Sequence, residues 1–319
     1  MSNPASAPGR RTHTRAHVEA LAAKYRTWGH WGPDDELGAA NRVTPERIVA
    51  AAGLVRRGAV FSLALPMDGE GPMTGRNGRV NPQHVMLRDG GDMAPGDVQG
   101  YTDDAVYLPL QASTQWDALC HFFHEGRAYN DRGPESVTSR GAVHNSITGL
   151  RDRAIGRGVL LDLPRAAGRP WWEPGEAIQP EDLERCAAVQ GVEVREGDFL
   201  LVRTGEIARR RAAGGWGDYA GGPAPGLGVD SAEFLCPRGI VGVATDTWGI
   251  EAIPYEAPLL APLHVILLVN AGIYIGEMWD MEELADDCAA DGVGEFLLTA
   301  PPLTITGAVG SPLNPIAVK

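Results

Sequence analysis

The sequence predicts an α/β fold, and three observations support this prediction. Four short runs rich in Val, Leu and Ile are bounded by turn residues, as is typical of buried strands: 59–65, 158–163, 198–204 and 239–245. Helical stretches alternate with these runs, at residues 180–191 and 281–292. The chain of 319 residues is 44% apolar, which can support a sizeable core.

A further helix is predicted at residues 45–57, PERIVAAAGLVRR, just before the first predicted strand. Thr44 is a suitable N-cap, and Pro45 fits the first helical turn. Gly58 is expected to close the segment at its far end.

Near the other end of the chain, the apolar run HVILLVNAG predicts a helix that begins at His264 and ends at Gly272. The following IYIGE is predicted to be a strand that closes with Glu277. A histidine and a glutamate are unusual in so apolar a region, and both therefore need an explanation.

Two connections are unusually long and rich in Gly and Pro, residues 66–100 and 214–228. Loops of that length are usually functional lids or partner contacts. No internal repeat or shift in composition marks a second domain, so we expect one catalytic domain over residues 25–319. Residues 1–24 lack the apolar core of a signal peptide and are interpreted as a mobile arm.

The composition argues against several classes of partner. A net charge of −13 disfavours binding to nucleic acid or to an anionic membrane surface. The most apolar window, residues 257–276, has membrane-spanning length but contains prolines, a histidine and an asparagine, so it is interpreted as core. The four cysteines form no CxxC pair, which favours reduced thiols and a cytoplasmic location.

The stretch LQASTQWDALCHFFHEG, residues 109–125, places ionisable side chains among aromatic ones. No proline interrupts it after Asp117, so a helix that begins near this residue is predicted. On a helical wheel of about 100° per residue, the aromatic residues and Cys120 cover one side, while Asp117, His121 and His124 share a polar stripe. Cys120 is therefore expected to be a packed thiol and not a nucleophile.

Asp117 and His121 stand four residues apart, the offset that stacks two side chains on one helical face. A carboxylate and an imidazole so placed suit zinc, manganese or iron(II). The alternative is that Asp117 caps the helix and His121 is an ordinary polar-face residue. His264 and Glu277 favour a metal site, because buried ionisable groups need partners and a shared metal would supply one.

At these residues the sequence resembles the metal-dependent cyclase and kynurenine formamidase-like hydrolase family, which includes isatin hydrolases. The family signature HxGTHxDxPxH corresponds to QASTQWDALCH, residues 111–121, in which Thr114, Asp117 and His121 match. Gln111 and Gln115 stand where the signature has two histidines. Ser113 and Leu119 also depart from it, replacing glycine and proline.

The resemblance extends over roughly residues 25–319. GVATDTW at 242–248 and the segment 264–277 resemble two further family elements, and residues 31–46 and 121–130 resemble the longer branch of the family. The implied architecture is the swivelling β/β/α cyclase-like fold, an α/β fold with a mixed central sheet and flanking helices.

The resemblance also implies a metal site. In two-metal members, one ion is held by the two signature histidines and the aspartate, and the other by the same aspartate, the last signature histidine, and a downstream histidine and glutamate. The first site loses both imidazoles here, whereas the second is complete as Asp117, His121, His264 and Glu277. Because neutral amide oxygens are poor substitutes for imidazole, we expect one divalent ion at most, manganese or zinc.

The implied activity is hydrolysis of a C–N or ester bond in a small amide, lactam or lactone, with metal-bound water as the nucleophile. Gln111 and Gln115 are expected to contact the substrate carbonyl or the water, and His124 to act as general base or to support a ligand. The glutamines could equally satisfy backbone groups near a strand end. Two alternatives stay open: metal-assisted cyclisation or dehydration of a natural-product intermediate, and a metal-free small-molecule-binding homologue.

Four residues are expected to contact the substrate: His84, Trp116, Asp246 and Trp248. His84 lies in the long loop GRNGRVNPQHVM, where Arg79 is more simply explained as loop surface. Asp246 and Trp248 end a buried strand, a common place for ligand contacts in α/β proteins, although packing is a frequent role of tryptophan. The resemblance further implies a homo-oligomer, either a dimer or a tetramer.

Overall fold

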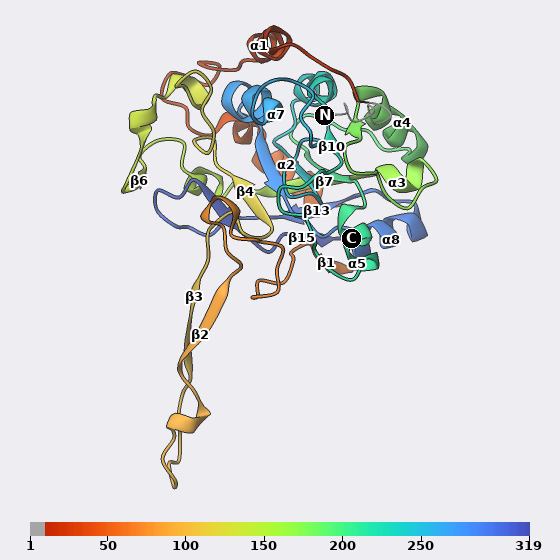
Figure 1. Cartoon of the computed structure of the whole chain (residues 1–319). Helices are drawn as coiled ribbons and strands as arrows, with labels where there is room; N and C mark the ends of the chain where they lie inside the picture. The colour runs from red at the N-terminus through yellow and green to blue at the C-terminus, as the bar shows by residue number, and fades with distance from the viewer. Residues whose placement is uncertain (1–9) are drawn as a thin grey trace, which may run out of the picture.

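A nine-stranded mixed sheet forms the centre of the structure, a computed structural model that describes residues 10–319 (Figure 1). In spatial order its strands are β1 (Val60–Ser62), β15 (Ile316–Val318), β13 (Glu295–Thr299), β7 (Ile155–Asp162), β9 (Phe199–Arg203), β11 (Gly242–Thr245), β12 (Tyr274–Glu277), β4 (Gln115–Asp117) and β14 (Gly310–Pro312). The four strands from β7 to β12 run parallel, and the outer strands pair antiparallel. The predicted α/β fold with a mixed central sheet is confirmed.

Helices flank this sheet. They are α1 (Arg15–Lys24), α2 (Pro45–Ala52), α3 (Leu163–Ala166), α4 (Pro180–Gln190), α5 (Glu206–Ala212), α6 (Ala232–Leu235), α7 (Pro262–His264), the π-helical η9 (Val265–Ala271) and α8 (Glu282–Asp291). α2 packs against β7 and β13, and α4 packs against β7. Parallel strands covered in this way need apolar residues on both faces, which explains why every residue of β9 is buried.

The four predicted strands are present in the sheet as β1, β7, β9 and β11, and two of the predicted helices are present as α4 and α8. The helix predicted at 45–57 is shorter and ends at Ala52, where the N–H of Gly53 bonds Val49 and the chain turns. The helix predicted from His264 starts at Pro262, continues as η9 and ends at left-handed Gly272. The strand after it closes with Glu277, as predicted.

The helix predicted from Asp117 is wrong. Gln115–Asp117 form β4, which pairs with β12 on one side and with β14 on the other. Pairing at both edges satisfies the backbone of this segment within the sheet, so local helical periodicity does not decide its structure. The chain turns directly after the strand, where the N–H of His121 bonds the carbonyl of Ala118.

The N-terminal segment also differs from the predicted mobile arm. Residues 15–24 form α1, whose first turn is capped by the Thr14 side chain. Val18 and Leu21 are buried in the main hydrophobic core, and the helix packs against η9. This part of the segment is therefore fixed to the protein, and residues 1–9 lie outside the described residues.

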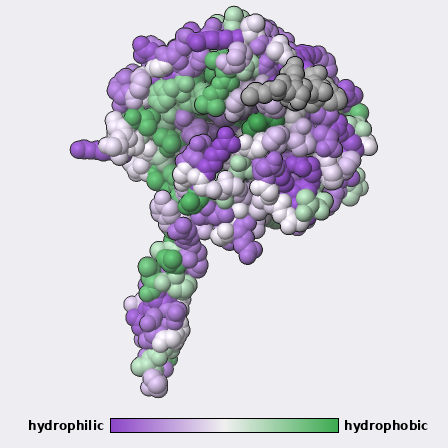
Figure 2. Space-filling view, in the orientation of Figure 1, coloured by the Kyte–Doolittle hydropathy of each residue, from purple (hydrophilic) through white to green (hydrophobic). Residues whose placement is uncertain are grey.

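The long connection at 66–100 contains β2 (Gln83–Arg88), which pairs with β3 (Asp103–Tyr107) in a projecting hairpin that extends away from the body of the molecule (Figure 1). Figure 2 shows both polar and apolar residues on its surface. Two smaller two-stranded sheets pair β5 (Val137–Thr138) with β6 (Gly141–Ala142), and β8 (Ala177–Ile178) with β10 (Gly226–Leu227).

All four cysteines are free, and Cys120 is buried, as expected for a packed thiol. Burial raises the pKa of Cys120 to about 12, so this thiol is not ionised at neutral pH. Within residues 10–319, none of the helices is both long enough and apolar enough to span a membrane. The apolar window at 257–276 instead forms η9 and most of β12 in the core.

Candidate metal centre

Two neighbouring strands, β4 and β12, bring three polar side chains to one face of the sheet. Their pairing sets Gln115 opposite Glu277, and directly paired residues point to the same face. Side chains alternate along a strand, so Asp117 shares this face with Gln115, whereas Trp116 between them points to the other face. Gln115, Asp117 and Glu277 are all buried.

A fourth polar side chain, His264, is held against the same place by Glu251. One oxygen of Glu251, Oε1, accepts hydrogen bonds from the backbone N–H groups of Leu263 and His264, both at 3.1 Å. The same oxygen accepts from His264 Nδ1 at 2.8 Å. The carboxylate thus satisfies the free N–H groups at the start of α7 and fixes the ring, leaving Nε2 for another partner.

The free faces of these side chains converge. His264 Nε2 lies 3.5 Å from Asp117 Oδ2 and 3.7 Å from Glu277 Oε1. Asp117 Oδ2 is buried and has no hydrogen-bond partner among the described residues. A buried carboxylate oxygen without a donor is costly, and a divalent cation would satisfy it. Two carboxylates and an imidazole form a donor set that zinc or manganese accepts.

Burial separates this cluster from other groups of similar composition. Within residues 10–319, three groups offer one ligand atom per residue within 4.8 Å: Asp117, His264 and Glu277; His13, His17 and Asp230; and Glu19, His124 and Glu125. Only the first group is buried at all three positions. A buried group of ionisable side chains has no water to satisfy it, so it has the strongest need for a bound ion.

His121, the fourth predicted ligand, lies beside this cluster. Its Nε2 is 3.8 Å from Asp117 Oδ1, and its Nδ1 is buried without a hydrogen-bond partner among the described residues. The turn after β4, and not a helix, brings His121 back towards Asp117. The two side chains are neighbours as predicted, although the predicted reason was wrong.

The cluster has strongly perturbed ionisation. Burial and the charge of Asp117 raise the pKa of Glu277 to about 8. Burial also acts to raise the pKa of Asp117, but the His121 and His264 rings hold it below its usual value. Burial lowers the pKa of His264, but Glu251 and Asp117 together raise it well above the ordinary value. Without a cation, Glu277 and His264 therefore retain protons, which a metal would displace.

The two glutamines that replace signature histidines occupy different positions. Gln115 Nε2 lies between the carboxylates and donates to Asp117 Oδ1 at 3.2 Å and to Glu277 Oε2 at 3.0 Å. Its Oε1 is buried and lacks a hydrogen-bond partner among the described residues. The Gln111 amide lies against Gly310, which pairs with Asp117 across the sheet, and its Nε2 also has no partner there.

Two residues expected to contact substrate belong to the framework instead. Trp116 is fully buried, packs against Phe199 and Trp279, and donates from Nε1 to the carbonyl of Ala300 at 3.0 Å. Alternation along β4 explains this correction, because Asp117 and its neighbour Trp116 must point to opposite faces.

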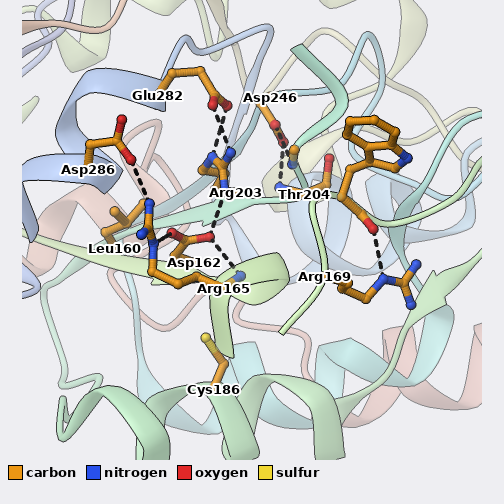
Figure 3. A network of polar contacts seen from close by, with 12 residues as sticks. Leu160, Asp162, Arg165, Arg169, Cys186, Arg203, Thr204, Asp246, Glu282 and Asp286 are labelled. Carbon is orange, nitrogen blue, oxygen red and sulfur yellow. Dashed lines mark hydrogen bonds and ion pairs between the residues drawn. The ribbon is translucent and has the colours of Figure 1, made fainter. Parts of the chain in front are cut away.

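Asp246 is the second such correction. Its carboxylate accepts from the backbone N–H groups of Thr204 and Gly205 at 2.7 and 2.8 Å, as part of the network in Figure 3. Burial raises the pKa of Asp246 to about 6. Because both oxygens are bonded and the residue is fully buried, it holds the ends of β9 and β11 together and has no face for a substrate.

His84 and His124 each lie next to an acidic residue outside the cluster. His84 is exposed on β2, where Nε2 lies 2.8 Å from Asp104 Oδ2 on β3. His124 has Nε2 at 3.9 Å from Glu19 of α1, because the turn after β4 does not continue the helix that would have aligned it with Asp117. Neither position supports the role expected from the sequence in substrate binding or base catalysis.

Trp248, the fourth residue expected to contact substrate, lies close to the cluster of Asp117, His264 and Glu277. It is half-buried, and its ring lies below the guanidinium of Arg79, with Cζ 5.7 Å from the ring centre. Two residues later, the N–H of Ile250 donates to Glu277 Oε1 at 3.2 Å. Burial is the largest influence on the pKa of Asp117 and of Glu277 and acts to raise both. The charge of Arg79 acts in the opposite direction on both groups.

A second group of charged side chains lies at the ends of β7 and β9 (Figure 3). It lines part of a cavity of about 240 Å³. Arg203 bonds Asp162 at 2.8 Å and forms two bonds to Glu282, at 2.8 and 2.7 Å. Arg165 bonds Asp162 and Asp286. These charges satisfy one another, so this group is a structural network, in contrast to the unsatisfied atoms around Asp117.

Sequence reasoning missed Glu251 and undervalued Arg79. Glu251 is buried in the apolar segment after β11, and a glutamate in such a segment is the same signal that drew attention to Glu277. Arg79 gave no such signal, because its neighbours are polar and its position depends on a loop.

Comparison with known proteins identifies relatives of this chain in one family. A model of the Cyclase family matches residues 59–252. A crystal structure described as a novel cyclase is 41% identical, and the match covers 92% of this chain and 100% of that protein with a TM-score of 0.86. None of the curated proteins matches this chain.

More distant structures share the fold. Isatin hydrolase A from Labrenzia aggregata, bound to benzyl benzoate, is 21% identical over 85% of this chain and 97% of its own, with a TM-score of 0.59. A predicted metal-dependent hydrolase from Bacillus stearothermophilus is 18% identical over 82% of this chain and 98% of its own, with a TM-score of 0.53.

Proposed function

Because the chain belongs to the cyclase family, we propose that it is a hydrolase that depends on one divalent metal ion and cleaves a C–N or ester bond in a small amide, lactam or lactone. The observation that carries this proposal is the convergence of His264 Nε2, Glu277 Oε1 and Asp117 Oδ2 on one buried point, where Asp117 Oδ2 has no hydrogen-bond partner within residues 10–319. Neighbours named isatin hydrolase and metal-dependent hydrolase support the reaction class.

Asp117, His121, His264 and Glu277 would hold the ion, manganese or zinc. A divalent ion supplies Lewis acidity for the substrate carbonyl and makes water nucleophilic near neutral pH. Glu251 holds His264 in the tautomer with the proton on Nδ1, so that Nε2 has a free lone pair.

Gln115 and Gln111 have separate tasks in this proposal. The Gln115 amide N–H groups hold one oxygen of each carboxylate, and its Oε1 is left to accept a hydrogen bond from the attacking water. Gln111 Nε2 is a donor for the substrate carbonyl. Two neutral amides in place of imidazoles leave one ion position, which is why we propose a single ion.

The test is hydrolysis in ¹⁸O-labelled water. Protein loaded with manganese or zinc is incubated with isatin and with a panel of amides, lactams and lactones, and the products are analysed by mass spectrometry. Label in the carboxylic acid product supports hydrolysis, and an unlabelled cyclised or dehydrated product would support elimination instead. Asp117→Asn should abolish the reaction, whereas Asp104→Asn, an exposed carboxylate on β3, should retain it.

We also propose a cytoplasmic homo-oligomer. Four free cysteines suit a reducing compartment. The β2–β3 hairpin exposes Val85, Leu87 and Tyr107, and a two-stranded ribbon is marginally stable without further contacts. Cover by a second copy of the chain would supply these contacts.

A further inference from the structure

Two hydrogen-bond donors beside the metal centre have no acceptor within residues 10–319. The Arg79 guanidinium forms no hydrogen bond or ion pair with the residues that the structure describes, and Trp248 Nε1 is buried without a partner among them. The guanidinium carbon lies 5.7 Å from the centre of the Trp248 ring, so the two donors are neighbours and one ligand can contact both. Buried donors are nearly always satisfied in folded proteins, so the buried Trp248 Nε1 calls for an acceptor, and the half-buried Arg79 offers its guanidinium to the same ligand.

This place adjoins the carboxylate Glu277. A Cβ on Gly249, the residue after Trp248, would lie 3.9 Å from Glu277 Oε1. The next residue, Ile250, donates its N–H to the same oxygen at 3.2 Å. The Trp248 side chain therefore leaves the backbone directly beside the cluster. Arg79 is close enough for its charge to act on Asp117 and Glu277, yet it bonds neither of them.

The loop holds the backbone of Arg79 in a fixed position. Arg79 closes a tight turn, in which its carbonyl accepts from the N–H of Gly75 at 3.0 Å and its N–H donates to Arg76 at 3.1 Å. Arg76 in turn donates to the carbonyl of Gly221 at 2.6 Å. Trp216 Nε1 ties the same loop to the second long connection through the carbonyl of Glu70. A donor held by such a scaffold binds its ligand at a lower entropic cost.

We propose that Arg79 and Trp248 form an anion-binding subsite that receives a carboxylate group of the substrate, which makes the substrate of the proposed hydrolase an organic acid anion. The forked N–H groups of a guanidinium match the two oxygens of a carboxylate. The Trp248 ring supports the guanidinium from one side and adds an indole N–H donor. The buried Arg203, in contrast, already has carboxylate partners within the chain.

The subsite can be tested without turnover. Binding of benzoate and of its neutral analogue benzamide is measured by isothermal titration calorimetry on chelator-treated, metal-free protein. Wild type should bind benzoate about tenfold to a hundredfold more tightly than benzamide, because charged hydrogen bonds are lost with the amide. Arg79→Gln should remove this preference, Arg79→Lys should retain part of it, and Trp248→Phe should weaken it.

Arg88→Gln is the matched control, because Arg88 also stacks on an aromatic ring, that of Tyr101, but lies on the projecting hairpin. It should bind benzoate as wild type does. Equal binding of benzoate and benzamide by wild type, or an unchanged preference in a folded Arg79→Gln variant, would overturn the proposal. The subsite depends on the proposed function only for the identity of its ligand as substrate. A benzoate preference without metal binding or hydrolysis would refute the proposed function while leaving the subsite in place.

Discussion

Glu251→Gln is the most informative single substitution around the centre. Glu251 Oε1 accepts from three donors, two backbone N–H groups and His264 Nδ1. Glutamine keeps an oxygen at this position but removes the negative charge. The hydrogen bonds therefore survive in neutral form. Loss of the charge weakens the support of the His264 ring and the binding of any ion by that ring.

The expected loss is about tenfold to a hundredfold in metal affinity, which corresponds to about 1.4–2.7 kcal/mol. Replacing a charge-assisted hydrogen bond to His264 by a neutral one costs about 1 kcal/mol, close to the lower end of that range. Glu251→Ala should do more damage, because it leaves three donors without an acceptor in a buried place. With each orphaned donor costing about 1–3 kcal/mol, the free energy of unfolding should fall by about 3 kcal/mol or more.

Metal affinity is measured by competition with a chromophoric chelator, and the free energy of unfolding by urea denaturation. Glu256→Gln is the control, since Glu256 is also buried and accepts from the N–H groups of Arg11 and Val229, away from the cluster. It should leave metal affinity unchanged. Equal affinity in Glu251→Gln and wild type would refute the role of Glu251 in holding His264.

Three further predictions follow from the same structure. Asp117→Ala and His264→Ala should each abolish metal retention in elemental analysis, whereas Cys120→Ala should retain metal and cost on the order of 1 kcal/mol in urea denaturation. Metal affinity should rise as pH increases to about 8. Burial and Asp117 raise the pKa of Glu277 to about 8, and the ion must displace that proton. A series of metal titrations from pH 6 to 9 that shows no rise in affinity would contradict this prediction. Light scattering should give a homo-oligomer, and deletion of residues 83–107 should shift it towards the monomer, so a monomeric wild type would count against this prediction.

Sequence periodicity predicted much of the sheet, because the parallel strands are short apolar runs with turns at both ends. It failed at β4, because a helix was predicted to begin near Asp117 and the alternation of Gln115, Trp116 and Asp117 was not recognised as a strand. Three residues are too few to separate the two periods, and the pairing with β12 and β14 that decides the structure comes from strands far away in the sequence. The same error placed His124 on a polar stripe with Asp117 and His121.

The proximity of Asp117, His264 and Glu277 was predicted from the family resemblance and from the oddity of ionisable residues in apolar segments. Glu251 could have been found by the second signal. Arg79 and His84 could not be placed, because both belong to a long connection whose course depends on hydrogen bonds within the loop and on a projecting hairpin. The structure separates them, with Arg79 beside the cluster and His84 exposed on β2.

The metal content of protein purified without chelator tests the central claim most directly. Elemental analysis of the wild type should give about one equivalent of manganese or zinc per chain, held by Asp117, His121, His264 and Glu277. Two equivalents, both lost in Asp117→Ala, would contradict the single-ion centre that Gln111 and Gln115 imply. Less than about a tenth of an equivalent, with no uptake on addition of either metal, would contradict the metal centre itself.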